Sequence, residues 1–162
     1  MRVLITGASG QLGYSLLKAD PVNKDIRALR HPELDISDAA AVNKVVQGFR
    51  PEVIVNAAAY TAVDRAETEF DQALKANAAG PENLAKAAKT IDARLIHIST
   101  DFVFDGMQSR PYRPDDPINP LSAYGRSKAE GEVRVRAVLG ESAVIVRTGW
   151  VYAAKGHNFV NT

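Results

Sequence analysis

The stretch Arg2-Val-Leu-Ile-Thr6 followed by Gly7-Ala-Ser-Gly10-Gln-Leu-Gly13 decides the fold that this chain is expected to adopt. A short β-rich apolar run closed by glycine is typical of a buried parallel strand. An apolar pattern with helical spacing follows, and strand, glycine turn and helix start are the context of a dinucleotide-binding loop. We expect Gly7 to permit the tight turn, Gly10 to let the backbone approach a pyrophosphate, and Gly13 to let helix and strand pack closely. The N-terminus of this helix then offers free N–H groups to the phosphates.

Composition narrows the class of protein further. The chain has 162 residues, enough for one domain with a core, and its 46% hydrophobic and 24% charged residues are those of an ordinary globular protein. A net charge of +1 favours neither nucleic acid nor an anionic membrane as a partner, and the lack of cysteine excludes disulfides and thiol chemistry. No long apolar segment precedes the first strand, so we expect no signal peptide, no membrane span and a cytoplasmic protein.

Strand-like and helix-like segments alternate along the rest of the chain. Further strands are expected at Asp25–Leu29, Glu33–Ile36, Glu52–Val55, Arg94–Ile98 and Ala143–Val146. Between them we expect a helix capped by Ser37 or Asp38 and stopped by Pro51, and two helical stretches within residues 64–90 with a break near Gly80-Pro81. This alternation predicts an α/β domain over residues 1–162, a Rossmann-type, doubly wound parallel sheet with helices on both faces.

Small and polar residues follow the predicted strands at their carboxyl ends, where open α/β sheets bind ligands. Ala57–Ala59 leave room for a flat ligand, and the Thr100 hydroxyl is placed to face a bound carbonyl. Asn77 is expected to hold a water or a backbone group, and His97 to be a packed strand residue rather than a catalyst. The proline-rich loop of residues 105–120 is too long for a plain connector and is expected to border a site.

Tyr124 and Lys128 lie four residues apart in Leu121-Ser-Ala-Tyr-Gly-Arg-Ser-Lys128, a spacing that stacks two side chains on one face of a helix. A nearby ammonium favours the ionised phenol, so we expect Lys128 to lower the pKa of Tyr124 and let it pass a proton near neutral pH. On its own the pair also fits an ordinary surface helix. Its convergence with the glycine loop, Ala57–Ala59 and Thr100 at one rim of the sheet makes it an active-site candidate.

Arg30 follows the second predicted strand, where an NAD-preferring site carries an acidic residue for the ribose 2′-hydroxyl. A planar cation with several donors would pair with a 2′-phosphate instead. The sequence therefore favours NADPH, with NADH as the alternative cofactor. The competing interpretation is that Arg30 simply faces solvent.

Several phrases of the sequence resemble the extended short-chain dehydrogenase/reductase superfamily and, more narrowly, the dTDP-4-dehydrorhamnose reductase family. The wider resemblance is carried by Thr6-Gly-Ala-Ser-Gly-Gln-Leu-Gly13 together with Tyr124-x-x-x-Lys128. The narrower one is carried by Asn56-Ala-Ala-Ala-Tyr-Thr-Ala-Val-Asp64, His97-Ile-Ser-Thr-Asp-Phe-Val-Phe-Asp-Gly106, Tyr124-Gly-Arg-Ser-Lys128 and Arg147-Thr-Gly-Trp-Val-Tyr152. The resemblance covers essentially the whole chain.

This resemblance implies reduction of the 4-keto group of dTDP-4-dehydrorhamnose, a dTDP-4-keto-6-deoxy sugar, to dTDP-L-rhamnose, with hydride from NADPH or NADH. Tyr124 would donate the proton, Lys128 would lower its pKa and hold the nicotinamide ribose, and Thr100 would orient the carbonyl. Asp101 and Trp150 would contact the sugar. The expected cofactor-binding residues are Gly7, Gly10, Gln11, Leu12, Arg30, Asp35, Ile36, Ala57, Ala58, Ala59, Tyr124 and Lys128.

Two departures from the family pattern qualify this expectation. Gly149 stands where the family usually has serine, beside the sugar site. Family members also continue into a smaller C-terminal domain that closes over the nucleotide-sugar. This sequence stops within the family's motif after the sixth strand, so we expect either a fragment or a remaining part that lies beyond residue 162. A chain of residues 1–162 is therefore expected to keep a cofactor fold and to lose most substrate affinity. Some members are described as using Mg²⁺ at a dimer contact; no ligand cluster in the sequence indicates a metal site, and a homodimer is left open.

Two other functions fit the same motifs. One is another extended reductase or an epimerase of a different nucleotide-sugar; an epimerase recycles its hydride, so net NADPH consumption separates the two. The other is a non-catalytic cofactor-binding subunit, because the regulatory β chain of methionine adenosyltransferase resembles this same family. The intact set of Thr100, Tyr124 and Lys128 argues against a non-catalytic subunit.

Overall fold

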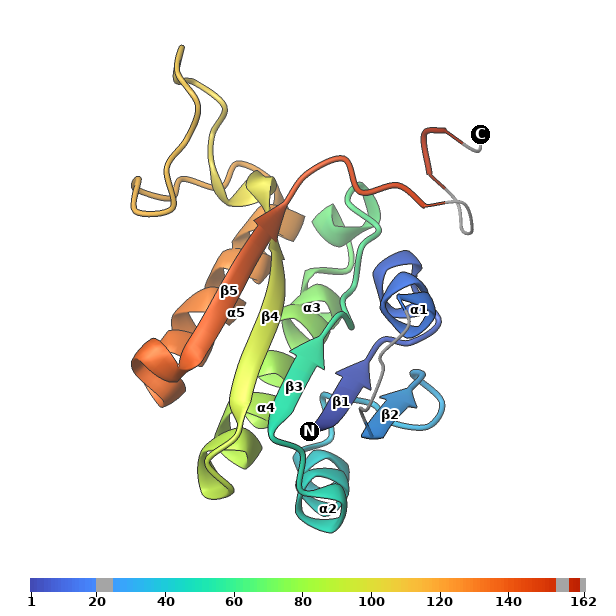
Figure 1. Cartoon of the computed structure of the whole chain (residues 1–162). Coiled ribbons are helices and arrows are strands. Elements are labelled where there is room, and N and C mark those ends of the chain that lie inside the picture. The colour runs from blue at the N-terminus through green and yellow to red at the C-terminus, as the bar shows by residue number, and fades with distance from the viewer. Residues whose placement is uncertain (20–24, 154–157, 161–162) are drawn as a thin grey trace.

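A computed structural model of the chain, which describes residues 1–19, 25–153 and 158–160, shows a five-stranded parallel sheet (Figure 1). Its strands are β1 (Arg2–Thr6), β2 (Asp25–Leu29), β3 (Val53–Asn56), β4 (Arg94–Thr100) and β5 (Ala143–Thr148). They lie in the order β2-β1-β3-β4-β5, and each neighbouring pair is parallel. The Rossmann-type α/β class predicted from the sequence is confirmed.

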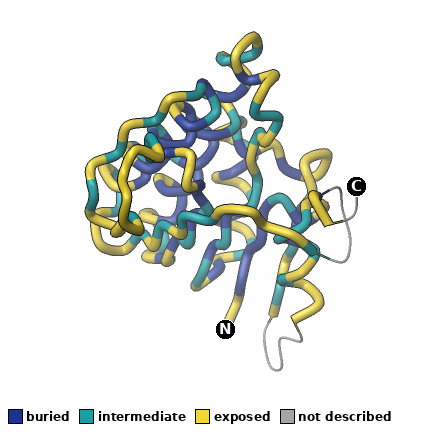
Figure 2. The backbone as a smooth tube through the Cα atoms, turned by 90° about the horizontal axis from the view of Figure 1, so that it is seen from above, coloured by how far each residue is buried: buried dark blue, intermediate teal, exposed yellow. Residues whose placement is uncertain are grey.

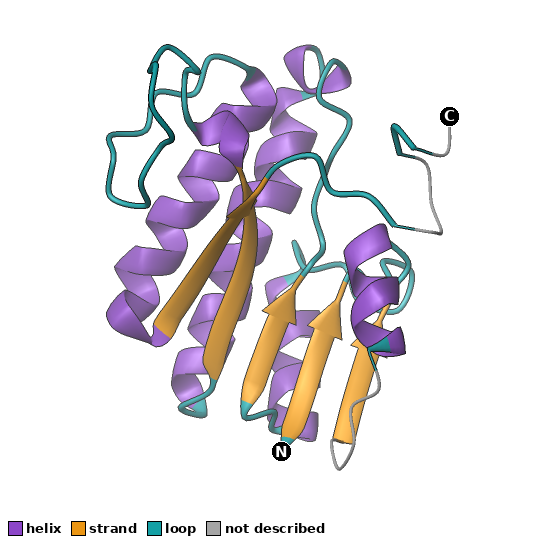
Figure 3. Cartoon of the chain, turned by 45° about the horizontal axis from the view of Figure 1, so that its top comes forward, coloured by secondary structure: helices purple, strands orange, loops and turns teal. Residues whose placement is uncertain are grey.

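Helices pack on both faces of this sheet. The α-helices are α1 (Gln11–Lys18), α2 (Ala39–Phe49), α3 (Phe70–Leu74), α4 (Gly80–Thr90) and α5 (Ala123–Leu139), and short 3₁₀ turns occupy Arg65–Glu67, Asp101–Val103 and Gly140–Ser142. Figure 3 shows α2, α4 and α5 as one layer behind the sheet and α1 on the opposite face. Within the described ranges, no helix has the length and apolar character needed to span a membrane.

The third predicted strand, Glu33–Ile36, was wrong. The Arg30 carbonyl accepts hydrogen bonds from the N–H groups of Glu33 and Leu34, at 2.9 and 3.0 Å, so the chain turns back instead of extending a ladder. The apolar side chains that suggested a strand, Leu34 and Ile36, are buried in the core beneath the sheet's helix layer. The alternation of apolar and polar residues in this segment reflects how an irregular stretch packs on the core. The remaining predicted strands match β2 to β5 within one or two residues at each end.

The predicted break near Gly80-Pro81 was also wrong. A π-helical segment, η2 (Lys75–Ala79), joins α3 to α4 without interruption. Pro81 lies in the first turn of α4, where a missing N–H is tolerated. Gly80 matters for packing, because a Cβ there would lie 2.5 Å from Cγ1 of Ile36. The irregularity is a widened turn, a feature often found at functional sites.

The core lies between the sheet and the layer of α2, α4 and α5. Figure 2 shows buried residues concentrated inside the molecule and exposed residues along much of its outer chain. Fully buried members of the core include Leu4, Val42, Val46, Ile54, Leu84, Leu95 and Val135. Asp38, one of the two predicted caps, begins α2 by accepting hydrogen bonds from the N–H groups of Ala40 and Ala41 at 2.9 and 3.0 Å.

Candidate functional site

A cavity of about 620 Å³ lies at the carboxyl ends of the central strands. It is lined by the glycine loop after β1, the segment after β2, the small residues after β3, the end of β4, one face of α5 and the chain after β5. Of the residues expected at a site, the lining holds Gly7, Gly10, Gln11, Leu12, Asp35, Ile36, Ala57, Ala58, Ala59, Thr100, Asp101, Tyr124, Lys128 and Trp150. Arg30 is the exception, although its neighbour His31 lines the cavity.

The glycine loop turns tightly beneath this cavity. Gly7 has φ +70°, in the left-handed region that glycine adopts without strain, and a Cβ there would lie 2.5 Å from the N of Ala58. The N–H of Gly10 donates to the Gly7 carbonyl at 3.0 Å, and Gly10 precedes α1. A Cβ on Gly13 would collide with the Gly7 carbonyl oxygen. The loop, α1 and the chain after β3 therefore pack too closely for larger residues at Gly7 and Gly13.

Asn56 holds the small residues after β3 in place. Its Oδ1 accepts hydrogen bonds from the Thr6 hydroxyl at 2.7 Å and the Ala58 N–H at 3.2 Å, so its Nδ2 is left to donate to Nδ1 of His97 at 3.0 Å. This arrangement puts the His97 proton on Nε2, which has no hydrogen-bond partner among the described residues. Burial, and secondarily Lys128, hold the pKa of His97 well below its ordinary value. His97 is thus a neutral packed strand residue.

Lys128 is almost completely buried, with 2% of its surface exposed. It lies on α5, which begins where the Ser122 hydroxyl accepts the Gly125 N–H at 3.0 Å. Its ammonium donates to the Ile98 carbonyl at 2.7 Å. Burial lowers the pKa of Lys128 to about 8, and the carboxylate of Glu132 opposes that shift. The site therefore holds a lysine that gives up its proton more readily than an exposed lysine does.

Tyr124 differs from the sequence-based expectation in the direction of its pKa. Burial raises the pKa of the Tyr124 phenol above its ordinary value, a hydrogen bond with Thr100 opposes the rise, and the charge of Asp101 adds to it. The expected lowering by Lys128 is not found in this structure: burial, Thr100 and Asp101 account for the pKa shift of Tyr124, and the Lys128 ammonium donates to the Ile98 carbonyl. The phenol ring also packs edge-on against Phe102, with ring centres 5.7 Å apart.

Thr100 and Asp101 form the adjoining wall. The Thr100 hydroxyl donates to the Asp101 carboxylate at 3.1 Å and accepts the Phe102 N–H at 3.2 Å. A Cβ on Gly149 would lie 2.5 Å from Oδ2 of Asp101. The glycine that departs from the family pattern therefore leaves room for this position of the carboxylate. Trp150, 78% exposed, follows with φ +52° and contacts Phe159 edge-on at 5.4 Å.

Asn77 connects the site to the π-helical segment and was not predicted as a site residue. Its side chain accepts the Tyr60 N–H at 2.8 Å and donates to the Tyr60 carbonyl at 3.0 Å, so it holds a backbone group, as expected. It also donates to the Ser127 hydroxyl at 2.9 Å, which donates to the Tyr124 carbonyl at 2.7 Å. Asn77 thereby ties the chain after β3 to the helix that carries Tyr124 and Lys128. The sequence feature that could have identified Asn77 is its position as a polar residue inside an alanine-rich helical stretch.

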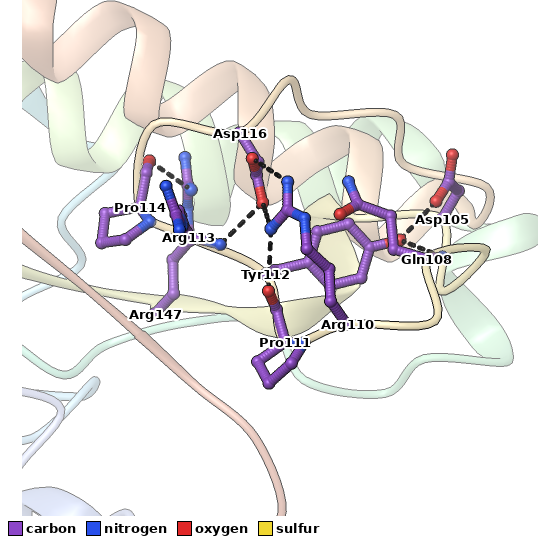
Figure 4. Close-up of polar contacts among 9 residues, drawn as sticks. All are labelled: Asp105, Gln108, Arg110, Pro111, Tyr112, Arg113, Pro114, Asp116 and Arg147. Atoms are coloured by element: carbon purple, nitrogen blue, oxygen red, sulfur yellow. Dashed lines mark hydrogen bonds and ion pairs between the residues drawn. The ribbon is translucent and has the colours of Figure 1, made fainter.

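The loop of residues 105–120 borders a second, larger hollow of about 820 Å³ between the loop and β5. That hollow shares only Asp101 with the residues expected at a site, so the smaller cavity is the candidate functional site. Figure 4 shows how the loop is held together by its own polar contacts. Asp116 receives both terminal nitrogens of Arg110, at 2.8 and 2.9 Å, and Asp105 accepts the Tyr112 hydroxyl at 2.5 Å.

The fold and the site together define a class. A doubly wound parallel sheet with a glycine loop after β1, and with a tyrosine and a buried lysine at i and i+4 of a helix beside it, is a Rossmann-type domain of the short-chain dehydrogenase/reductase class. Comparison with known proteins then gives the particular family. The chain belongs to the dTDP-4-dehydrorhamnose reductase family, because the family model described as the RmlD substrate binding domain matches residues 1–162.

Individual relatives agree with this assignment. The chain is 47% identical to the dTDP-4-dehydrorhamnose reductase of Aggregatibacter actinomycetemcomitans over 163 residues, which is 99% of this chain and 55% of that protein. A crystal structure of the Bacillus anthracis dTDP-4-dehydrorhamnose reductase in complex with NADP superimposes with a TM-score of 0.96 at 43% identity, and that from Clostridium acetobutylicum with 0.95 at 46%; each match covers 99% of this chain and 57% of the other. The chain spans about half the length of the curated relatives it matches.

Proposed function

We propose that this chain forms the cofactor half of an NADPH-dependent dTDP-4-dehydrorhamnose reductase, which reduces the 4-keto group of a dTDP-4-dehydro-6-deoxy-L-hexose to give dTDP-L-rhamnose. The observation that carries the proposal is the cavity in which the glycine loop, Thr100, Tyr124 and Lys128 meet. Family membership supports the choice of substrate. Because the chain covers about half of its relatives, the whole activity is assigned to a longer protein that contains it.

The residues present fit a nicotinamide dinucleotide. The glycine loop and the start of α1 offer N–H groups to a pyrophosphate, and the alanines after β3 leave a flat opening. In this proposal Gly7, Gly10, Gln11 and Leu12 bind the phosphates, and Asp35, Ile36 and Ala57–Ala59 border the adenine and ribose. When bound, the cofactor would supply hydride to the substrate's C4 carbonyl carbon.

The proton side of the reaction falls to Tyr124. As C4 gains hydride its oxygen becomes an alkoxide, and the phenol O–H is proposed to donate the proton to it. Thr100 is proposed to orient that oxygen, since its hydroxyl lies at the same wall of the cavity. Lys128 is proposed to hold the nicotinamide ribose, and its positive charge in the same cavity would favour the phenolate that remains after proton donation. Asp101 and Trp150 are proposed to contact the sugar.

The test is NADPH consumption with dTDP-4-keto-6-deoxy-L-mannose by the full-length protein and by its Tyr124→Phe variant. Loss of one positioned proton donor is expected to lower kcat roughly 10²- to 10⁴-fold. The Kd for NADPH should change less than about twofold, since the phenol O–H is the only group removed. A full-length protein that binds NADPH and leaves it unoxidised with this sugar would overturn the proposal. An epimerase or a non-catalytic regulatory subunit would then be the better assignment.

A further inference from the structure

Arg30 and Glu33 form a turn at the rim of the cavity, directly beside the glycine loop. The Ala8 N–H of that loop donates to the Leu29 carbonyl at 3.1 Å, so the loop is bonded to the residue that precedes Arg30. His31 and Leu34 within the turn line the cavity. Leu34 is buried in the core, which fixes the position of the turn. Arg30 is therefore held close to the proposed phosphate-binding loop although it does not line the cavity itself.

Glu33 contacts Arg30 in a particular way. One carboxylate oxygen, Oε2, accepts both the backbone N–H and the Nε–H of Arg30, each at 2.9 Å. The Glu33 N–H in turn donates to the Arg30 carbonyl at 2.9 Å. These hydrogen bonds hold the pKa of the Glu33 carboxyl at about 2, so it is ionised at any working pH. The guanidinium is thus fixed through its inner nitrogen.

The outer edge of the guanidinium is left for another ligand. Neither terminal nitrogen of Arg30 has a partner among the described residues, and the side chain is 62% exposed. Two parallel N–H groups on a planar fork match two oxygens of one phosphate. A carboxylate that occupied the terminal pair would block such a contact, as Asp116 does for Arg110. Glu33 instead occupies only Nε.

We propose that Glu33 is a positioning residue for cofactor choice, which presents the terminal nitrogens of Arg30 to the 2′-phosphate of NADP(H). The inference rests on the proposed function, since it requires a nicotinamide dinucleotide in the cavity. Glu33 also repels the phosphate, but both side chains are largely in water, where salt and solvent screen repulsion between separated charges. Glu33 contacts Arg30 directly through hydrogen bonds of 2.9 Å, whereas the guanidinium would lie between Glu33 and the phosphate, so positioning is the larger effect.

The experiment measures Kd for NADP⁺ and NAD⁺ by isothermal titration calorimetry, for the wild-type chain and for Glu33→Ala, Glu33→Gln and Arg30→Ala. Glu33→Ala is expected to weaken NADP⁺ binding roughly three- to fivefold, with NAD⁺ changed less than about twofold. Glu33→Gln keeps an oxygen that can accept both hydrogen bonds and should stay within about twofold of wild type for both nucleotides. Arg30→Ala should lower the preference for NADP⁺ at least as much as Glu33→Ala.

A matched control is Glu130→Ala, which removes a similarly exposed carboxylate from Arg134 on α5, away from the cavity lining. It should leave both Kd values unchanged. The inference is overturned if Glu33→Ala binds NADP⁺ as tightly as wild type or more tightly, if it weakens both nucleotides equally, or if Arg30→Ala leaves their ratio unchanged. Failure of the wild-type chain to bind either nucleotide would instead overturn the proposed function.

Discussion

Two polar clusters of similar hydrogen-bond geometry occupy opposite environments in this protein. The inner cluster lies between the sheet and the helices and consists of Thr6, Asn56, Asn77, His97, Ser99, Ser127, Lys128 and Glu132, all buried. The loop cluster is the network within residues 105–120 shown in Figure 4, where no residue is buried. Hydrogen bonds between side chains range from 2.5 Å to 3.0 Å in these examples from each cluster: Ser99–Glu132 and Asn56–His97 in the inner cluster, and Tyr112–Asp105 and Asn119–Asp105 in the loop cluster. The two clusters differ in whether water can take the place of a lost hydrogen-bond partner.

Removing a partner from the inner cluster leaves a buried group that water cannot reach. Such a loss costs several kcal/mol for a charge, whereas an exposed ion pair is worth about 1 kcal/mol or less. The inner cluster touches the candidate site through Ser99 and Lys128. The loop cluster is bonded mostly within its own segment, and its Pro114 carbonyl also accepts a hydrogen bond from Arg147 of β5 at 3.0 Å. The comparison predicts that the molecule is sensitive to changes in the first cluster and tolerant of changes in the second.

The largest effect is expected for Glu132→Ala. Glu132 receives the Arg147 guanidinium at 2.7 Å and the Ser99 hydroxyl at 2.5 Å, with the carboxylate side chain 3% exposed. Truncation strands a largely buried guanidinium, so the free energy of unfolding should fall by roughly 3–5 kcal/mol. Urea denaturation followed by circular dichroism measures it. A decrease in the free energy of unfolding below about 1 kcal/mol would mean that the Glu132–Arg147 pair contributes no more than a surface ion pair. The contrast between the two clusters would then be refuted.

Next in size is the pH dependence contributed by Lys128. Its pKa is about 8 in the folded chain and 10.5 as the ordinary value, so between those values the unfolded state keeps a proton that the folded state has lost. The free energy of unfolding of wild type should therefore rise relative to Lys128→Met as pH increases from 7 to 10, by on the order of 3 kcal/mol. Parallel curves for wild type and Lys128→Met would contradict the low pKa.

Gly131→Ala tests how closely the inner cluster is packed. A Cβ at Gly131 would collide with the backbone oxygen of Asn77, so α5 and the π-helical segment would have to separate. The expected loss is roughly 1–3 kcal/mol, even though alanine is the better helix former. Gly48→Ala in α2 is the control, because a Cβ there meets nothing within 4 Å and should stabilise the helix slightly. Equal behaviour of the two variants in thermal unfolding would refute the close approach.

The smallest effect on stability is expected for Asp116→Ala. It removes the two bonds from Arg110 and the bond from the Arg113 N–H at 2.7 Å, all in an exposed loop. The free energy of unfolding should change by less than about 1 kcal/mol. Local order should fall more, so chymotrypsin should cut after Tyr112 faster than in wild type. A loss as large as that of Glu132→Ala would show that the loop supports the whole fold.

The sheet and most of the candidate site could be predicted because they depend on local patterns. β1, the glycine loop and the spacing of Tyr124 and Lys128 are each read within a few residues, and parallel topology brings the strand ends together. Glu33–Ile36 was misjudged because alternating burial does not reveal whether a segment has a strand to pair with. The pKa of Tyr124 depends on burial and on where the Lys128 ammonium points, which only the packed structure shows. Asn77 needed a contact with Ser127 fifty residues away.

The strand order also bears on how the chain can fold as it leaves the ribosome. β1 emerges first, β2 joins one side of it, and β3, β4 and β5 then add in turn on the other side. Each new strand docks on an exposed edge, and none has to enter between strands that are already paired. Parallel pairing still requires closure of long loops, which is slow and leaves strand edges open to aggregation. Because the sheet grows by adding strands at its edges, the order in which the ribosome releases the strands can set the order in which these loops close.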